Sequence, residues 1–301
     1  MTQDQQRAGL LRAMPLVFVL IWSTGFIVAK YGLPYAPPLS FLSIRYALSL
    51  LCFVAWIALA RVTWPQSRKQ WLHLGVTGIL IHAGYLGGVW SAIKGGMGSG
   101  LSALIVGLQP VLTALWVSAM ATERRITPRQ WLGLTLGLAG LLLVVWRRLG
   151  EGEVTAANLL LALMALLSIT AGTLYQKRFV KPCDVRTANT VQLMAAFAVT
   201  APLALWEPGR FDMHPELLGA MAWSVLVLTL GGSSLLYLLI QRGAATAVTS
   251  LMYLVPPCTA VLAWILFGEQ FTAPVLGGLA LTALGVWLVV RAPATQPKER
   301  P

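Results

Sequence analysis

Ten stretches of mostly apolar residues follow one another along the chain, separated by short polar gaps. About 20 residues of α-helix span the roughly 30 Å hydrocarbon core of a bilayer. We therefore predict an all-α membrane protein with ten transmembrane helices. Their expected bounds are 13–33, 39–60, 70–93, 98–120, 128–146, 156–178, 187–206, 217–240, 245–267 and 273–291. The gaps are too short to hold a separate soluble domain.

Composition supports this prediction. Of the 301 residues, 57% are hydrophobic and 11% are charged, whereas a soluble domain carries about 25% charged residues. The net charge is +12, and the basic residues fall mainly in the gaps, where they orient a membrane protein. No platform of basic and aromatic residues is visible, so we expect no nucleic-acid partner.

The positions of Lys and Arg predict the orientation. With a cytoplasmic N-terminus, the gaps on the cytoplasmic side contain sixteen of these residues and those on the other side five. The positive-inside rule therefore places both termini in the cytoplasm, and we expect a multi-pass protein of a bacterial inner membrane. The first stretch is predicted to be a retained helix and not a signal peptide, because no small-residue cleavage pattern follows it.

The chain contains an internal repeat, with copies at 13–147 and 156–291. A shift of 147 residues places Trp22–Lys30 on Ile169–Lys177 and Pro110 on Pro257. Five helices are an odd number, so the second copy must enter the membrane from the opposite side. Inverted repeats of this kind are typical of secondary transporters, which alternate between states open to either side.

Several short motifs add to this pattern. They are W-S-x-G-F-x-x-x-K at 22–30, Pro37 and Pro38 followed by Arg45, a proline within the fourth helix of each copy, and two similar turns, in which a threonine follows Glu123 by four residues and Glu269 by three. With the ten spans and the repeat, they resemble the drug/metabolite transporter superfamily in its ten-helix form with two EamA-type repeats. The resemblance covers about residues 13–291.

This resemblance implies a central cavity lined by helices one to four and six to nine, with helices five and ten at the periphery. It also implies export of small metabolites, often amino acids. The second copy has Ile169 in place of Trp22 and Gln192 in place of Arg45. We therefore do not expect the two halves to contribute equally to substrate binding.

Two spans carry the most informative polar residues. Arg45 lies about two turns inside span two, where it either contacts a substrate carboxylate or outer gate, or extends to the interface and helix-end carbonyls. His82 lies near the middle of span three, followed by Tyr85 and Trp90. These aromatics predict a cavity wall, and we favour an interhelical hydrogen bond for His82 over proton transfer, because no Asp or Glu lies within the spans.

Further candidate cavity residues are spread over the other spans. They are Trp22, Ser23, Gln109, Gln192, Tyr237 and Tyr253. Pro110, Pro256 and Pro257 either bend their helices during gating or form static kinks. Glycines in spans five and ten predict close helix packing, within one chain or between two.

The sequence shows no catalytic, metal-binding or cofactor-binding constellation. Cys52, Cys183 and Cys258 have no pairing pattern. The expected function is thus export of a small molecule, with amino acids first and with drugs or nucleobases as alternatives on the same fold. A receptor or assembly protein without transport is the alternative from a different class. The expected environment is membrane lipid, the oligomeric state is monomer or homodimer, and energy coupling stays open.

Overall fold

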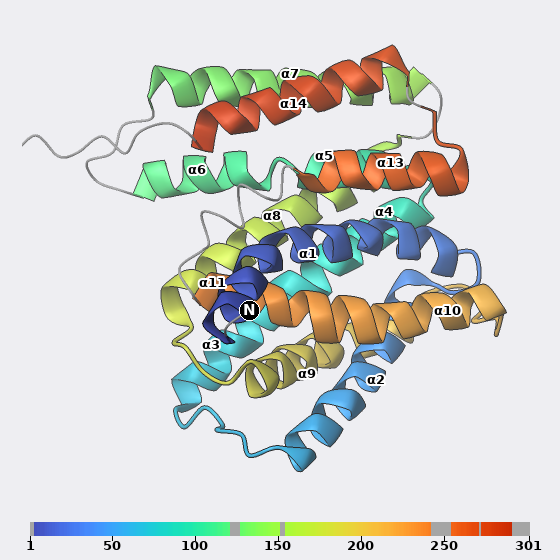
Figure 1. Ribbon diagram of the computed structural model, residues 1–301. Coiled ribbons are helices and arrows are strands. Elements are labelled where there is room, and N and C mark those ends of the chain that lie inside the picture. The colour runs from blue at the N-terminus through green and yellow to red at the C-terminus, as the bar shows by residue number, and fades with distance from the viewer. Residues whose placement is uncertain (1–2, 121–126, 151–153, 242–253, 271, 291–301) are drawn as a thin grey trace, which may run out of the picture.

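The computed structural model describes residues 3–120, 127–150, 154–241, 254–270 and 272–290, and these ranges contain helices and no strand (Figure 1). In chain order the helices are α1 (Gln3–Gly32), α2 (Pro38–Leu59), α3 (Arg68–Gly78), η1 (Ile79–Leu86), α4 (Gly87–Lys94), α5 (Ser99–Val106), α6 (Gln109–Met120), α7 (Pro128–Gly150), α8 (Ala156–Phe179), α9 (Val185–Ala204), α10 (Pro215–Trp223), η2 (Ser224–Ser233), α11 (Ser234–Gln241), α13 (Val255–Phe267) and α14 (Ala273–Val290).

Each predicted span contains helix in its described part. Five helical segments are long and apolar enough to cross a membrane by themselves: Pro38–Leu59, Arg68–Lys94, Ser99–Val117, Ala156–Phe179 and Pro215–Gln241. Shorter apolar helices occupy Leu16–Gly32, Trp131–Trp146, Val255–Phe267 and Ala273–Leu288. The all-helical fold is therefore confirmed, whereas ten crossings in two inverted halves stay a prediction.

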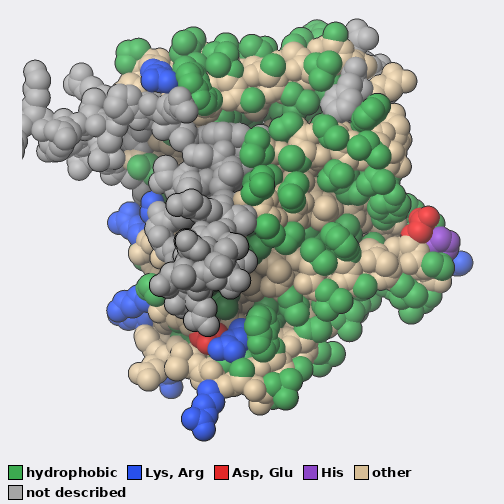
Figure 2. All heavy atoms as spheres, viewed as in Figure 1, with side chains coloured by type: hydrophobic (Ala, Val, Ile, Leu, Met, Phe, Trp, Pro, Cys, Tyr) green, Lys and Arg blue, Asp and Glu red, His purple; other side chains and the backbone are tan. Residues whose placement is uncertain are grey.

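The surface of the helix bundle is largely apolar, as expected for a surface in contact with lipid. Large apolar side chains such as Leu59, Trp146 and Leu205 are more than four-fifths exposed. Figure 2 shows hydrophobic side chains across the broad face and most of the visible Lys and Arg side chains along its left edge. A broad apolar face with basic side chains at one edge is typical of a protein oriented in a membrane.

Two long helical rods contain a π-helix in their middle. In one, α3, η1 and α4 follow without a break, and in the other α10, η2 and α11 do the same. The wider π turn lets side chains bond to carbonyls five residues back, as the Thr229 hydroxyl does to Ser224 O. π-helices are rare and occur frequently at functional sites.

The fourth predicted span is broken before its proline. Helix α5 ends at Val106 and α6 begins at Gln109, because Pro110 has no N–H to donate and its ring collides with the carbonyl four residues earlier. Gly107 lies in the break, where a Cβ would approach the Pro256 ring to 2.5 Å. Pro256 and Pro257 occupy the first turn of α13, where the missing donor costs nothing.

Helices α7 and α14 pack side by side at one edge of the molecule (Figure 1). Glycines allow this close approach: a Cβ on Gly140 would lie 2.6 Å from the carbonyl oxygen of Gly278. Gly285 packs in the same way against Gly133 and Gly137. The glycines of predicted spans five and ten therefore pack against each other within one chain.

Adding one methyl group to this seam tests the packing. We expect Gly140→Ala to lower the free energy of unfolding by about 1–3 kcal/mol, as overpacking does. Gly219→Ala is the matched control, because its Cβ would meet nothing within 4 Å and alanine favours a helix over glycine by about 1 kcal/mol. The measurement is the thermal unfolding of both variants in the same detergent, and equal stability of the two would contradict a tight seam.

Candidate functional site

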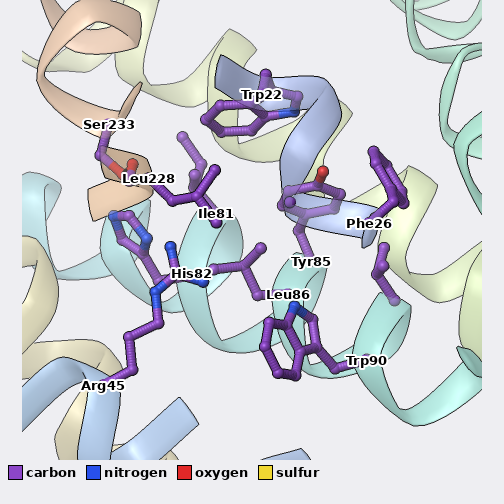
Figure 3. Close-up of a pocket in the computed structure, with 12 residues that line it drawn as sticks. Trp22, Phe26, Arg45, Ile81, His82, Tyr85, Leu86, Trp90, Leu228 and Ser233 are labelled. Atoms are coloured by element: carbon purple, nitrogen blue, oxygen red, sulfur yellow. Dashed lines mark hydrogen bonds between the residues drawn. The ribbon is translucent and has the colours of Figure 1, made fainter. Parts of the chain in front are cut away.

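A cavity lies at the centre of the bundle, between α1, α2 and the two rods that contain π-helices. Its volume is about 30 Å³, room for about two water molecules. The residues that line it are Trp22, Gly25, Phe26, Arg45, Ile81, His82, Tyr85, Leu86, Val89, Trp90, Leu228 and Ser233 (Figure 3). Five of the predicted cavity residues thus meet at one place.

Arg45 brings a charged group to this cavity. Its side chain is only 4% exposed, and its Nε–H donates to Thr229 Oγ1 at 2.9 Å. Figure 3 shows the guanidinium rising from α2 towards His82 and Ser233. Arg45 therefore does not extend to the interface, whereas its contact with a substrate carboxylate or an outer gate stays a prediction. No carboxylate in the described part of the chain forms an ion pair with it.

Aromatic rings form the walls of the cavity. Trp22 of α1 stacks on Tyr85 of η1 with ring centroids 6.0 Å apart and planes within 1° of parallel. Trp90 of α4 packs against Phe41 of α2 with centroids 4.5 Å apart. Each of Trp22, Tyr85 and Trp90 is separated by three or four positions from another lining residue in the same continuous helical segment. This spacing places the lining residues of each segment on one face.

His82 is buried beside Arg45, and its backbone oxygen accepts a hydrogen bond from the Tyr46 hydroxyl at 2.8 Å. Its ring atom Nε2 has no hydrogen-bond partner in the described ranges, and neither does Nε2 of Gln192 on α9. The ring of His82 faces the side chain of Gln192 on α9 as a hydrogen-bonding partner, so the interhelical hydrogen bond that the sequence suggests for His82 stays a prediction. Buried polar atoms without a partner are uncommon and occur where a ligand or water binds.

Several predicted cavity residues have other surroundings. The Ser23 hydroxyl donates to Val19 O of its own helix, Gln109 donates to Thr173 Oγ1 at 3.1 Å, and the Tyr237 hydroxyl lies 2.9 Å from Cys183 Sγ. None of them, nor Gln192, lines the central cavity. Tyr253 lies outside the described residues.

Seven of the lining residues, and Thr229 beside them, were not among those the sequence suggested. Gly25 and Phe26 follow Trp22 by about one helical turn, so helical spacing could have found them. Thr229 and Ser233 belong to η2, where the spacing of an α-helix does not apply. Their hydroxyls gave no signal of their own in an apolar segment.

The sequence profile of the EamA-like transporter family matches residues 9–146 and again residues 157–291. The chain belongs to the EamA-like transporter family. The recognised resemblance to the drug/metabolite transporter superfamily is thereby confirmed. Membership makes the central cavity of this EamA-family protein the candidate site for a transported molecule.

Similar proteins cover nearly the whole chain. A probable amino-acid metabolite efflux pump of Salmonella typhimurium is 25% identical, covering 92% of this chain and 93% of its own. The uncharacterized transporter YvbV of Bacillus subtilis is 27% identical, covering 92% of this chain and 90% of its own. The uncharacterized inner membrane transporter YedA of Escherichia coli is 24% identical, covering 92% of each chain. A solved crystal structure matches with a TM-score of 0.68 at 19% identity, covering 91% and 94%, which shows a shared fold.

The half-buried carboxylate of Glu269 joins three helices at one end of this EamA-family bundle, which we call the Glu269 end. Glu269 accepts from Lys30 Nζ at 2.7 Å and from the backbone amides of Ser99 and Gly100 at 3.2 and 3.4 Å. Lys30 also lies 4.6 Å from the centroid of the Phe267 ring. The Glu269 carboxylate thus balances the charge of Lys30 in the last turn of α1. It also caps the N-terminus of α5, where a negative charge is favoured.

Two loops meet at the same end. The backbone amides of Leu39 and Ser40, at the start of α2, donate to the Glu207 carboxylate at 3.1 and 3.0 Å. The Tyr35 hydroxyl donates to Glu216 at 3.0 Å, and its ring stacks on His214. The link between α1 and α2 is therefore held against the link between α9 and α10.

The opposite end of the bundle, which we call the Gln70 end, is closed in a similar way. The Gln70 amide donates to Lys181 O at 2.7 Å and accepts from Lys181 N at 3.2 Å. The Thr187 hydroxyl donates to Thr63 O. Nearby, Arg186 pairs with Asp184 at 2.6 Å, and this hydrogen bond lowers the pKa of Asp184.

Weakening the Glu269 end should expose the cavity from that side. We expect Glu269→Gln to raise the labelling rate of Ser233→Cys several-fold, because the amide loses the ion pair to Lys30. The measurement uses a membrane-impermeant thiol reagent in a background without native cysteines. Asp184→Asn, which removes an ion pair at the Gln70 end, is the matched control. Equal labelling in both variants would exclude Glu269 as a closing contact.

Proposed function

We propose that this EamA-family protein is a secondary transporter that exports small metabolites by alternating access. The observation that carries the proposal is the central cavity with interhelical contacts at both ends of the described bundle. A transporter with this arrangement exposes the cavity by breaking the contacts at one end while those at the other persist. A receptor or assembly protein has no need for two such sets of contacts.

Corresponding contacts at the two ends support inverted halves. Tyr35 bonds to Glu216 at the Glu269 end, and Gln70 bonds to Lys181 at the Gln70 end. Lys181 and Glu216 lie 146 residues after Tyr35 and Gln70 respectively. The π-helices η1 and η2 lie about the same distance apart. A repeat that places the same contact at opposite ends is what a two-fold axis in the membrane plane requires.

The proposed orientation follows from Lys and Arg in the gaps. It places the Gln70 end and both termini in the cytoplasm and the Glu269 end outside. We propose the bacterial inner membrane as the location, supported by the name of the relative YedA, an inner membrane transporter. Membrane lipid is the proposed environment, the proposed assembly is a monomer or homodimer, and we propose neither an enzymatic activity nor a nucleic-acid partner.

Amino acids are the proposed substrate class, supported by the name of the Salmonella relative and by the pairing of a buried guanidinium with aromatic walls. A guanidinium suits a carboxylate, and aromatic rings suit an apolar side chain. Nucleobases or drugs are the alternative cargo. Cationic drugs are disfavoured because no Asp or Glu lies in any predicted span.

Cross-linking across one end tests alternating access. We expect Tyr35→Cys with Glu216→Cys, joined by a short bifunctional thiol reagent, to reduce amino-acid exchange in proteoliposomes about tenfold or more, because the closed end can no longer open. Reductant should restore the rate. Each single-cysteine variant, treated identically in a background without native cysteines, is the control. Full exchange by quantitatively cross-linked protein would contradict the proposed mechanism.

A further inference from the structure

We propose that the central cavity binds small arylcarboxylates through Arg45 and offers no acidic partner to an amino group. Carboxylates without the amino group then bind at least as tightly as the corresponding amino acids. This inference rests on the proposed function, since it names the chemical class that the transport cavity accepts. Of a bound amino acid, the cavity would thus recognise the carboxylate and the aromatic ring.

The first argument is the charge of the cavity. Among the described residues that line it, Arg45 is the one Lys or Arg and none is Asp or Glu. No Asp or Glu lies in any of the ten predicted spans, and the acids with described side chains lie in links or at helix ends: Asp184, Glu207, Asp212, Glu216 and Glu269. A charge buried in a bilayer requires a partner, and a bound carboxylate supplies one.

The second argument is the direction of the donors. Thr229 Oγ1 accepts from Arg45 Nε and fixes the side chain, so the terminal nitrogens of the guanidinium form the fork that faces the cavity (Figure 3). Such a fork matches the two oxygens of a carboxylate. The hydroxyl of Thr229 donates to Ser224 O at 2.9 Å and that of Ser233 to Leu228 O at 3.5 Å, so each of these backbone oxygens already accepts one hydrogen bond.

The third argument concerns the aromatic walls. A cationic amino group binds to an aromatic cage through open ring faces. Trp22 and Tyr85 stack on each other, and Trp90 packs on Phe41, so one face of each of these rings is covered by another ring and less open face is left for a cation. The walls also offer apolar area, which suits a flat aromatic ring. Because the cavity measures about 30 Å³, the walls must separate on binding, which favours small rings.

Three probes with the same ring test the inference on the purified full-length protein. They are 3-phenylpropionate, L-phenylalanine and 2-phenylethylamine, which carry the carboxylate alone, both groups, and the amino group alone. We expect the Kd of 3-phenylpropionate to be equal to or below that of L-phenylalanine. The Kd of 2-phenylethylamine should be about tenfold higher or more, because its cation meets Arg45 without an acidic partner. Calorimetric titration in detergent measures all three.

Variants at Arg45 assign the effect to its side chain. Arg45→Gln should weaken 3-phenylpropionate binding about tenfold or more, whereas Arg186→Gln, the same change outside the cavity, should leave it unchanged. Arg45→Lys keeps the charge but loses the fork, so it should weaken binding by an intermediate factor. It also serves as the second variant if Arg45→Gln does not elute as folded protein.

Three outcomes would overturn the inference: no binding of 3-phenylpropionate, tighter binding of 2-phenylethylamine than of 3-phenylpropionate, or full 3-phenylpropionate affinity in both Arg45 variants. The proposed function fails separately. Binding of 3-phenylpropionate in detergent without exchange of any probe by proteoliposomes would contradict transport and leave the inference standing. Exchange of 2-phenylethylamine alone would contradict the inference and leave transport standing.

Discussion

A guanidinium buried in an apolar helix bundle without an acidic neighbour is the constraint around which the centre of this protein is arranged. Hydrocarbon does not solvate Arg45, so neighbouring helices must supply polar contacts. The hydroxyl of Thr229 reaches it from η2, and His82 of η1 lies beside it (Figure 3). Both residues belong to π-helices, whose wider turn allows a hydroxyl to satisfy a carbonyl five residues back. The unusual backbone of the two rods and the charge between them thus belong to one arrangement.

Much of this fold could be predicted from the sequence because lipid imposes a simple rule on it. Every backbone donor in hydrocarbon needs a partner within its own helix. A long stretch of apolar residues is therefore helical, and the lengths of these stretches were enough to predict where the helices lie. The cavity was only partly predictable. Trp22, His82, Tyr85 and Trp90 came together because helical spacing determines a shared face. Tyr237 did not, since its hydroxyl pairs with Cys183, which lies in a link between helices and carries no periodic signal.

Local and distant roles of a residue are also hard to separate in a sequence. Glu269 follows α13 directly and looks like a local turn or cap. In the structure it caps α5, and its nearest charged partner is Lys30. Ser23 shows the reverse, since a hydroxyl that suggests a cavity contact bonds to its own helix, as serine commonly does. Hydrogen bonding within four residues competes with every long-range role that a small polar residue could have.

The position of Glu269 in the chain has a consequence for biogenesis. Lys30 is made 239 residues before its partner, and at about 5–20 residues per second the ribosome needs roughly 12–48 seconds to close that interval. During this time α1 and α5 are inserted with a lysine and two amides that lack their final acceptor. The contacts of Glu207 and Glu216 at the same end can form earlier, because both residues precede Glu269 in the chain. The contact between Glu269 and Lys30 is the last to form, when the chain is almost complete, and a truncated product that lacks α13 and its following turn would lack it.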